Sequence, residues 1–190
     1  ETVAQSILNV TGANAVVDWV RVELRSSSTP ATVLATKQGL LQRDGDVIAT
    51  DGSSPLSFNV GAGNYHVAIR HRNHLGAMTS SPVALNGTAA TVNFKGTSLT
   101  TYGTEAEKTI GTARALWMGN TTGNSAIQYT GSGNDRDPIL TRVGSTIPNS
   151  TVTGYFMEDT QLNGVVKYTG STNDRDPILV RVGSTTPNNT

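Results

Sequence analysis

The sequence feature that most limits the fold is a tandem repeat in the last third of the chain. Residues 117–151 align without a gap with residues 156–190, at an offset of 39, and 22 of the 35 paired positions are identical. The longest common stretch includes Asn-Asp-Arg-Asp-Pro-Ile-Leu in both copies. Nothing before Leu116 carries this pattern. The sequence therefore predicts two domains, 1–108 and 109–190, the second made of two 39-residue repeats at about 112–150 and 151–190.

The first domain has the patterning of a β protein. Residues 16–25 alternate between two faces, and glycine-containing turn signals such as Asp44-Gly45-Asp46 separate the apolar runs. Seven or eight strands in about 95 residues predict an antiparallel β-sandwich, immunoglobulin-like or transthyretin-like, so the expected fold class is mainly β. The other β-type runs are 3–10, 32–42, 46–50, 55–60, 65–70, 77–85 and 88–95.

Each repeat is expected to form a polar loop followed by a short helix. Asp137-Pro138 and Asp176-Pro177 have the residue types of an N-cap and a first helical turn, and Gly144 follows the first helix about two turns later. One such unit is too small to bury its apolar face alone. We expect the two copies to share a small core of Ile139, Leu140, Val143, Ile178, Leu179 and Val182.

Composition excludes several classes of partner and location. Fourteen basic and fourteen acidic side chains give a net charge of zero, which argues against nucleic-acid binding and against an anionic membrane surface. The apolar runs are too short to span a membrane. The chain has no cysteine, and its polarity comes largely from 28 Thr, 16 Ser and 15 Asn, a composition that favours a secreted or cell-surface β protein. A start at Glu1 fits a mature secreted product, or equally an excised segment.

The second repeat contains a candidate calcium loop. Asp159, Gln161 and Asn163 place oxygen side chains at positions 1, 3 and 5, Gly164 follows, and Val165 offers a backbone carbonyl at position 7. Position 12 is a glycine, so the remaining carboxylate has to come from slightly later in the chain. The two acids found there are Asp174 and Asp176.

The first repeat offers a weaker set of ligands. Its candidates are Asn120, Thr122, Asn124, Asp135 and Asp137, of which only the last two are charged. In both loops the structural alternative stays open, since Asn and Asp also form turns and helix caps without any ion.

The repeated Asn-Asp-Arg-Asp-Pro-Ile-Leu segment after such a loop resembles dockerin-type calcium repeats. The whole chain, through phrases at 18–25, 41–47 and 68–76, resembles the C-terminal region of secreted Bacteroidota surface proteins described as hemagglutinin-like or hypothetical. The resemblance implies a secreted, β-rich, calcium-binding protein without a settled biochemical activity. Asn120, Asn124 and Asn163 stand where that pattern usually has Asp.

The sequence leaves three functional classes to distinguish. We expect a calcium-stabilised structural or adhesive protein that self-assembles into a filament or surface array, through an N-terminal strand at 4–10 or the tail at 184–190. The alternative is a non-catalytic module that docks on a protein partner or binds a glycan. An enzyme is not expected, because no nucleophile-elbow motif is present and the acids cluster at turns and helix caps.

Two further groups of side chains are expected to be structural. Arg21, Arg25, Arg70 and Arg72 are expected to pair with nearby acids, namely Asp18, Glu23, Asp44 or Asp46. Trp19 and Trp117 are expected to be packing anchors rather than sugar platforms.

Overall fold

A computed structural model describes residues 2–185 and divides the chain into two compact units. The first, here called the sheet unit, comprises residues up to 71 together with 76–115. The second, the repeat unit, comprises 72–75 and the chain from 116 onward. The secondary structure is mainly β, as predicted.

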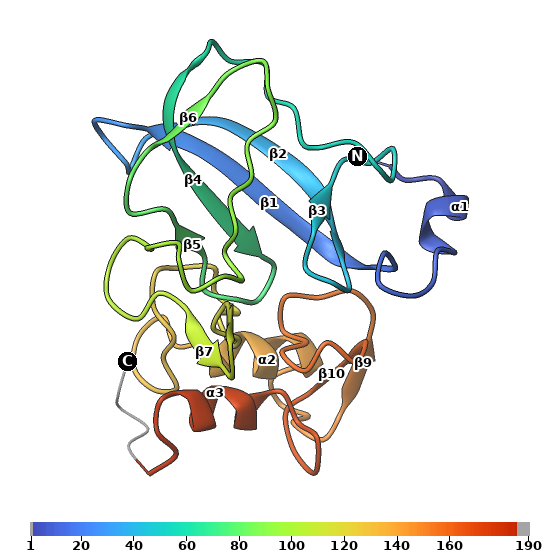
Figure 1. The fold of residues 1–190 in the computed structure, drawn as a ribbon. Coiled ribbons are helices and arrows are strands. Elements are labelled where there is room, and N and C mark those ends of the chain that lie inside the picture. Colours follow the sequence, from blue (N-terminus) through green and yellow to red (C-terminus); the bar gives the residue numbers. More distant parts are fainter. Residues whose placement is uncertain (1, 186–190) are drawn as a thin grey trace. The chain divides into compact units, whose positions relative to one another are not determined.

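The sheet unit is built on one antiparallel sheet whose strand order is β3-β2-β1-β4-β5, with β6 also paired to β4 (Figure 1). The three long strands lie at its centre, and the short ones flank them. Their bounds are β1 Val16–Ser26, β2 Val33–Gln42, β3 Val47–Ile48, β4 Gly63–His71, β5 Ala77–Met78 and β6 Val83–Leu85.

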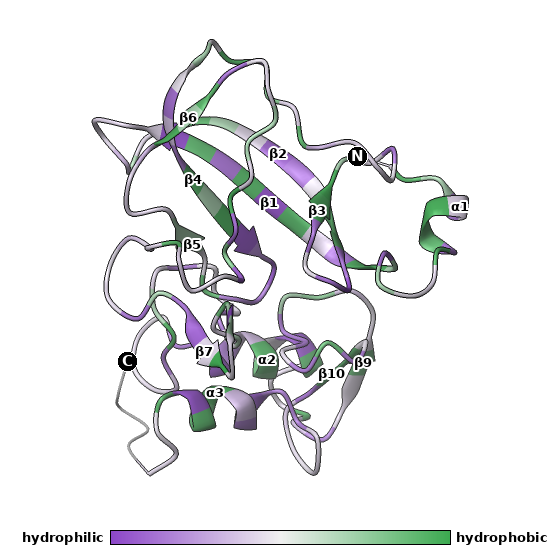
Figure 2. Ribbon diagram, in the orientation of Figure 1, coloured by the Kyte–Doolittle hydropathy of each residue, from purple (hydrophilic) through white to green (hydrophobic). Residues whose placement is uncertain are grey.

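The central strand β1 separates an apolar face from a polar one. Val22 and Leu24 are buried on one face and pack with Val67 of β4. Glu23, between them in sequence, points to the other face of the sheet, where its partner on β4 is Ala68. The alternation of apolar and polar residues along β1 is visible in Figure 2. This period of two fixes the register, because a slip of one residue would expose the core face.

Two of the predicted strands are extended segments that join no ladder. Residues 55–60 and 88–95 alternate as strands do, yet their apolar side chains, among them Leu56, Phe58 and Phe94, only pack against the core of the sheet. Alternation of apolar and polar residues indicates which side of a segment is buried, but it does not show that another strand lies beside the segment to form hydrogen bonds.

The prediction of a strand at 3–10 was wrong. This segment contains the short helix α1, Gln5–Leu8, in which the Gln5 side chain donates to Asn9 Oδ1 at 3.1 Å. Ile7 lies against Gly52, so this apolar residue of the segment is placed by packing and not by strand pairing.

The sheet unit extends further along the chain than residue 108. Strands β7, Lys108–Ile110, and β8, Ala113–Ala115, pair as a hairpin. Arg114 ties this hairpin to the preceding loop, donating from its backbone N–H to Lys95 and from Nη1 to the Leu99 carbonyl at 2.6 Å. The units consequently divide between Ala115 and Leu116.

Up to residue 185, the repeat unit contains two short helices and one hairpin. The helices are α2, Arg136–Val143, and α3, Arg175–Arg181, and the hairpin pairs β9, Thr151–Thr153, with β10, Val165–Lys167. The predicted shared core is confirmed: four of the six residues are buried, Leu140 and Leu179 pack against them, and Ile127 and Val166 complete the cluster.

The end of α2 follows the prediction more closely than the helix starts do, whereas α3 ends with Val182 as its C-cap, one residue before the predicted Gly183. Gly144 has a φ of 107° and ends α2, as its sequence position indicates. Each helix, however, begins before the Asp-Pro pair. The side-chain oxygen of Asn134 accepts the backbone N–H of Arg136 and of Asp137, so this asparagine caps the first turn.

Within residues 2–185, no helix is both long and apolar enough to cross a membrane.

Candidate functional site

A buried aspartate closes the loop of each repeat in the same way. Asp135 accepts the backbone N–H of Thr122 on one carboxylate oxygen, at 3.0 Å, and that of Gln128 on the other, at 2.8 Å. Thirty-nine residues later, Asp174 accepts the backbone N–H of Gln161 at 3.1 Å and of Lys167 at 2.8 Å. Each carboxylate thus joins two backbone N–H groups that lie six residues apart in its loop, those of Thr122 and Gln128 in the first repeat and of Gln161 and Lys167 in the second.

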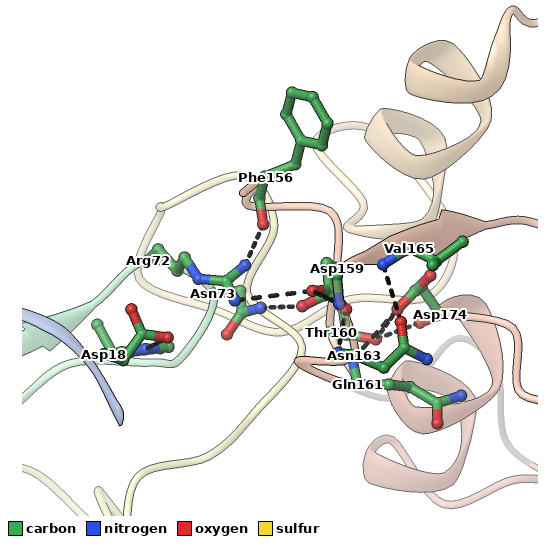
Figure 3. Close-up of polar contacts among 12 residues, drawn as sticks. Asp18, Arg72, Asn73, Phe156, Asp159, Thr160, Gln161, Asn163, Val165 and Asp174 are labelled. Carbon is green, nitrogen blue, oxygen red and sulfur yellow. Dashed lines mark hydrogen bonds and ion pairs between the residues drawn. The ribbon is translucent and has the colours of Figure 1, made fainter. Parts of the chain in front are cut away.

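The second loop holds another buried carboxylate, that of Asp159 (Figure 3). Its two oxygens accept the backbone N–H groups of Asn163, at 3.1 Å, and Gly164, at 2.9 Å. The φ of Gly164 is +81°, a left-handed conformation that glycine adopts without a steric penalty, and Leu162 two residues earlier has a φ of +57°. Asn163 in turn accepts the N–H of Val165 at 2.9 Å.

The first loop has the opposite hydrogen-bonding polarity at its first position. Asn120 is buried, and its side-chain amide donates to the Asn124 carbonyl at 2.8 Å. Its oxygen accepts from the Thr122 hydroxyl at 3.3 Å. A neutral amide therefore occupies the place of the Asp159 carboxylate, and Asp135 is the only buried carboxylate of this loop.

The segment 72–75 links the two loops, although strands of the sheet unit flank it in sequence. Asn73 is fully buried; its carbonyl accepts the N–H groups of Gly119 and Asn120, and its side-chain amide donates to the Asp159 carbonyl. Arg72 Nη2 lies 3.7 Å from Asp159 Oδ2, and Arg72 also donates to the Phe156 carbonyl. Arg72 thus pairs with an acid of the repeat unit, Asp159.

Two of the predicted ligands lie outside these clusters. The side chains of Asp137 and Asp176 are 59% and 57% exposed. Each accepts a hydrogen bond from the asparagine three residues earlier, at 2.8 Å from Asn134 and 2.7 Å from Asn173, and each lies beside the arginine that precedes it. They belong to the first turns of α2 and α3, where the helix dipole stabilises a negative charge.

Burial raises the pKa of the two loop-closing aspartates. Desolvation raises the pKa of Asp174, the nearby charge of Asp159 raises it further, and the backbone N–H groups of Lys167 and Gln161 oppose the rise. Desolvation also raises the pKa of Asp135, against the same kind of N–H donors. Hydrogen bonds from the loop therefore compensate only part of the cost of burying these charges.

The second loop matches the chemistry of a calcium site better than the first. A carboxylate oxygen has two acceptor positions, so each Asp159 oxygen keeps one free after accepting an N–H group. Asp174 keeps one free on Oδ2 only, because its Oδ1 also accepts the Thr160 hydroxyl at 3.3 Å. The described residues hold no group of three His, Asp or Glu side chains suited to a metal ion, so neutral oxygens have to complete any site. In the first loop, the Asn120 amide N–H₂ points into the loop and opposes a cation.

Several residues of these clusters were not predicted. Thr121 and Thr160 donate from their hydroxyls to the carbonyls of Asp135 and Asp174, and Asn134 and Asn173 cap the helices. Their identity in both repeats was a signal that could have found them. Nothing in the sequence near Asn73 indicates its role, because its contacts are with residues about 45 and 86 positions away.

Comparison of this chain with protein-family models, with curated proteins and with solved structures found no match.

Proposed function

We propose that this chain is a structural or adhesive protein of the cell exterior, not an enzyme, and that Ca²⁺ bound by the second loop stabilises its repeat unit. The observation that carries this proposal is the pair of buried carboxylates, Asp159 and Asp174, in one loop. Only Asp159 has a cationic side chain beside it, that of Arg72, among the described residues. A bound cation would balance the remaining charge.

Five residues would hold the ion. They are Asp159, Gln161, Asn163, Val165 through its carbonyl, and Asp174. All are oxygen ligands, which Ca²⁺ prefers, and the low number of charges suits the modest affinities of roughly 10⁻⁴–10⁻³ M found in extracellular modules. The ion would supply charge balance and rigidity, with no chemical step. We do not extend the proposal to a strong site at Asn120, Thr122 and Asn124.

The finer features of the fold are part of the same proposal. A dockerin-like relationship is supported by the repeat of a polar loop and a short helix around a shared core. A sandwich-like first domain is supported by the extended segments 55–60 and 88–95, which cover the core face of the sheet.

Self-association into a filament or array is supported by large apolar side chains that remain exposed. In the repeat unit, Val180 is 67% exposed, Tyr155 59% and Ile147 57%. The predicted strand at 4–10 is no longer available for this role, since α1 occupies it. Residues 186–190 of the predicted tail contact lie outside the described residues.

The test is sedimentation velocity in about 2 mM Ca²⁺, near the extracellular level, and in excess EGTA. We expect larger species only with calcium in the wild-type chain and in Asp137→Asn, and not in Asp159→Asn. A strictly monomeric chain in calcium would contradict self-assembly. It would favour the alternative of a binding module, which is supported by the arginine side chains around Glu23 on the polar face of the sheet.

A further inference from the structure

The polar face of the sheet carries an unusual concentration of arginine around one buried acid. Glu23 of β1 is 4% exposed, and three arginines surround it: Arg21 and Arg25 on the same strand and Arg70 on β4. Three positive charges against one negative charge leave a local net charge of +2. The chain as a whole has no net charge, so this cluster is locally more positive than the chain average.

Arg21 and Arg70 are directly opposite each other across β1 and β4. Both approach the same oxygen of Glu23 through Nε, at 3.1 and 3.4 Å. Within residues 2–185, neither side chain has a second acceptor, so the paired Nη groups of both guanidinium groups remain available. Their side chains are 45% and 36% exposed.

A partly buried aromatic side chain adds to this arginine face. Trp19 lies two residues before Arg21 in a regular part of β1, so the indole and the guanidinium point to the same side of the sheet. Trp19 is only partly buried. An indole ring offers a flat apolar surface, which suits the apolar face of a pyranose ring, next to donors that suit an anion.

From this arrangement, we propose that the arginine face, made of Trp19, Arg21, Arg25 and Arg70, binds the carboxylates of a uronic-acid polysaccharide. A guanidinium group presents two parallel N–H donors that match the two oxygens of a carboxylate. Two such groups held side by side by Glu23 are already oriented, which lowers the entropy cost of binding. The proposal concerns the sheet unit and does not depend on calcium binding by the repeats.

The test is a binding titration of the full chain with polygalacturonate oligomers in excess EGTA, so that the repeats play no part. We expect Arg21→Gln/Arg70→Gln to bind about tenfold more weakly or worse, as expected for lost hydrogen bonds to a charged group. Arg43→Gln is the matched control, because Arg43 is an exposed arginine outside this face, and it should bind as the wild type does. Trp19→Ala should also weaken binding.

Other outcomes would overturn the proposal. Three results would refute the binding site itself: no binding of polygalacturonate, a loss of affinity in Arg43→Gln equal to that in the double variant, or binding of neutral dextran as tight as that of polygalacturonate. Two would refute the ligand class. The first is tighter binding of dextran sulfate, and the second is binding of poly-L-glutamate or duplex DNA as tight as that of polygalacturonate and unchanged in Trp19→Ala. Melting temperatures show whether each variant is folded. If the double variant does not fold, Arg21→Gln alone decides, since Glu23 then keeps Arg25 and Arg70; unchanged binding in that variant would refute the assignment.

Discussion

Asn120 and Asp159 occupy the same position of the two repeats, yet they present opposite hydrogen-bonding groups to their loops. The Asp159 carboxylate accepts two backbone N–H groups, whereas the Asn120 amide donates to a backbone carbonyl. The position 39 residues before Asp159 thus lacks the negative charge that Arg72 accompanies at Asp159. The two loops share this position but differ in the charge and the hydrogen-bonding group that they place there.

Asn120→Asp is expected to make the first loop resemble the second. Without calcium, a second buried negative charge near Asp135 should lower the free energy of unfolding by about 1–3 kcal/mol. Excess Ca²⁺ should restore part of this loss. Urea denaturation in EGTA and in calcium measures both effects, and Asn124→Asp, which adds the same charge at an exposed position, should change little. Equal effects of the two substitutions would refute this reasoning.

Asp135→Asn is expected to destabilise the repeat unit by about 1–3 kcal/mol, because one backbone N–H, that of Thr122 or Gln128, then faces an amide N–H₂. Asp137→Asn, two residues later on an exposed side chain, should cost less than about 0.5 kcal/mol. Chemical denaturation followed by circular dichroism gives both values. A similar cost for the two variants would mean that burial of Asp135 does not matter.

The raised pKa of Asp135 predicts a specific pH dependence. Because burial raises this pKa above its ordinary value of 3.8, the folded state holds the proton more tightly than the unfolded state. The stability of the wild type relative to Asp135→Asn should therefore be greatest near pH 4 and fall as the pH rises through the folded-state pKa. Denaturation from about pH 4 to pH 7 in EGTA measures it, and a difference that grows with pH would contradict the sign.

Gly119 is expected to tolerate no side chain. Its φ is 108°, and a Cβ there would lie 3.2 Å from Ile178 Cγ1, in the core shared by the repeats. Gly119→Ala should cost at least about 1 kcal/mol more than Gly131→Ala, whose Cβ would meet nothing within 4 Å although its φ is also positive, 89°. Thermal unfolding of the two variants compares them, and equal melting temperatures would argue against close packing at Gly119.

Local patterns predicted the parts of the fold that depend on local physics. The alternation in 16–25 located β1, and Gly144 located the end of α2. The helix starts were misplaced because Asp-Pro resembles a cap, while Asn134 provides the actual one. The segments 55–60 and 88–95 were misassigned because a strand needs a neighbour, which a single-strand pattern does not specify.

The candidate site was predictable to the extent that it repeats. The recurrence of Asp135 and Asp174 indicated their importance, but their place in the loop depends on which backbone N–H groups turn toward them. Arg72 and Asn73 could not be assigned from the sequence, because only the folded chain brings 72–75 to residues 119 and 159.

The most direct test of the central claim is a calorimetric titration of Ca²⁺ into the full-length, metal-free chain at neutral pH. The proposal predicts one site of modest affinity, lost in Asp159→Asn and kept in Asp137→Asn. An absence of binding up to about 10 mM Ca²⁺, or equal binding by both variants, would contradict it. In that case, the buried aspartates would serve only to close the loops through the backbone N–H groups they accept.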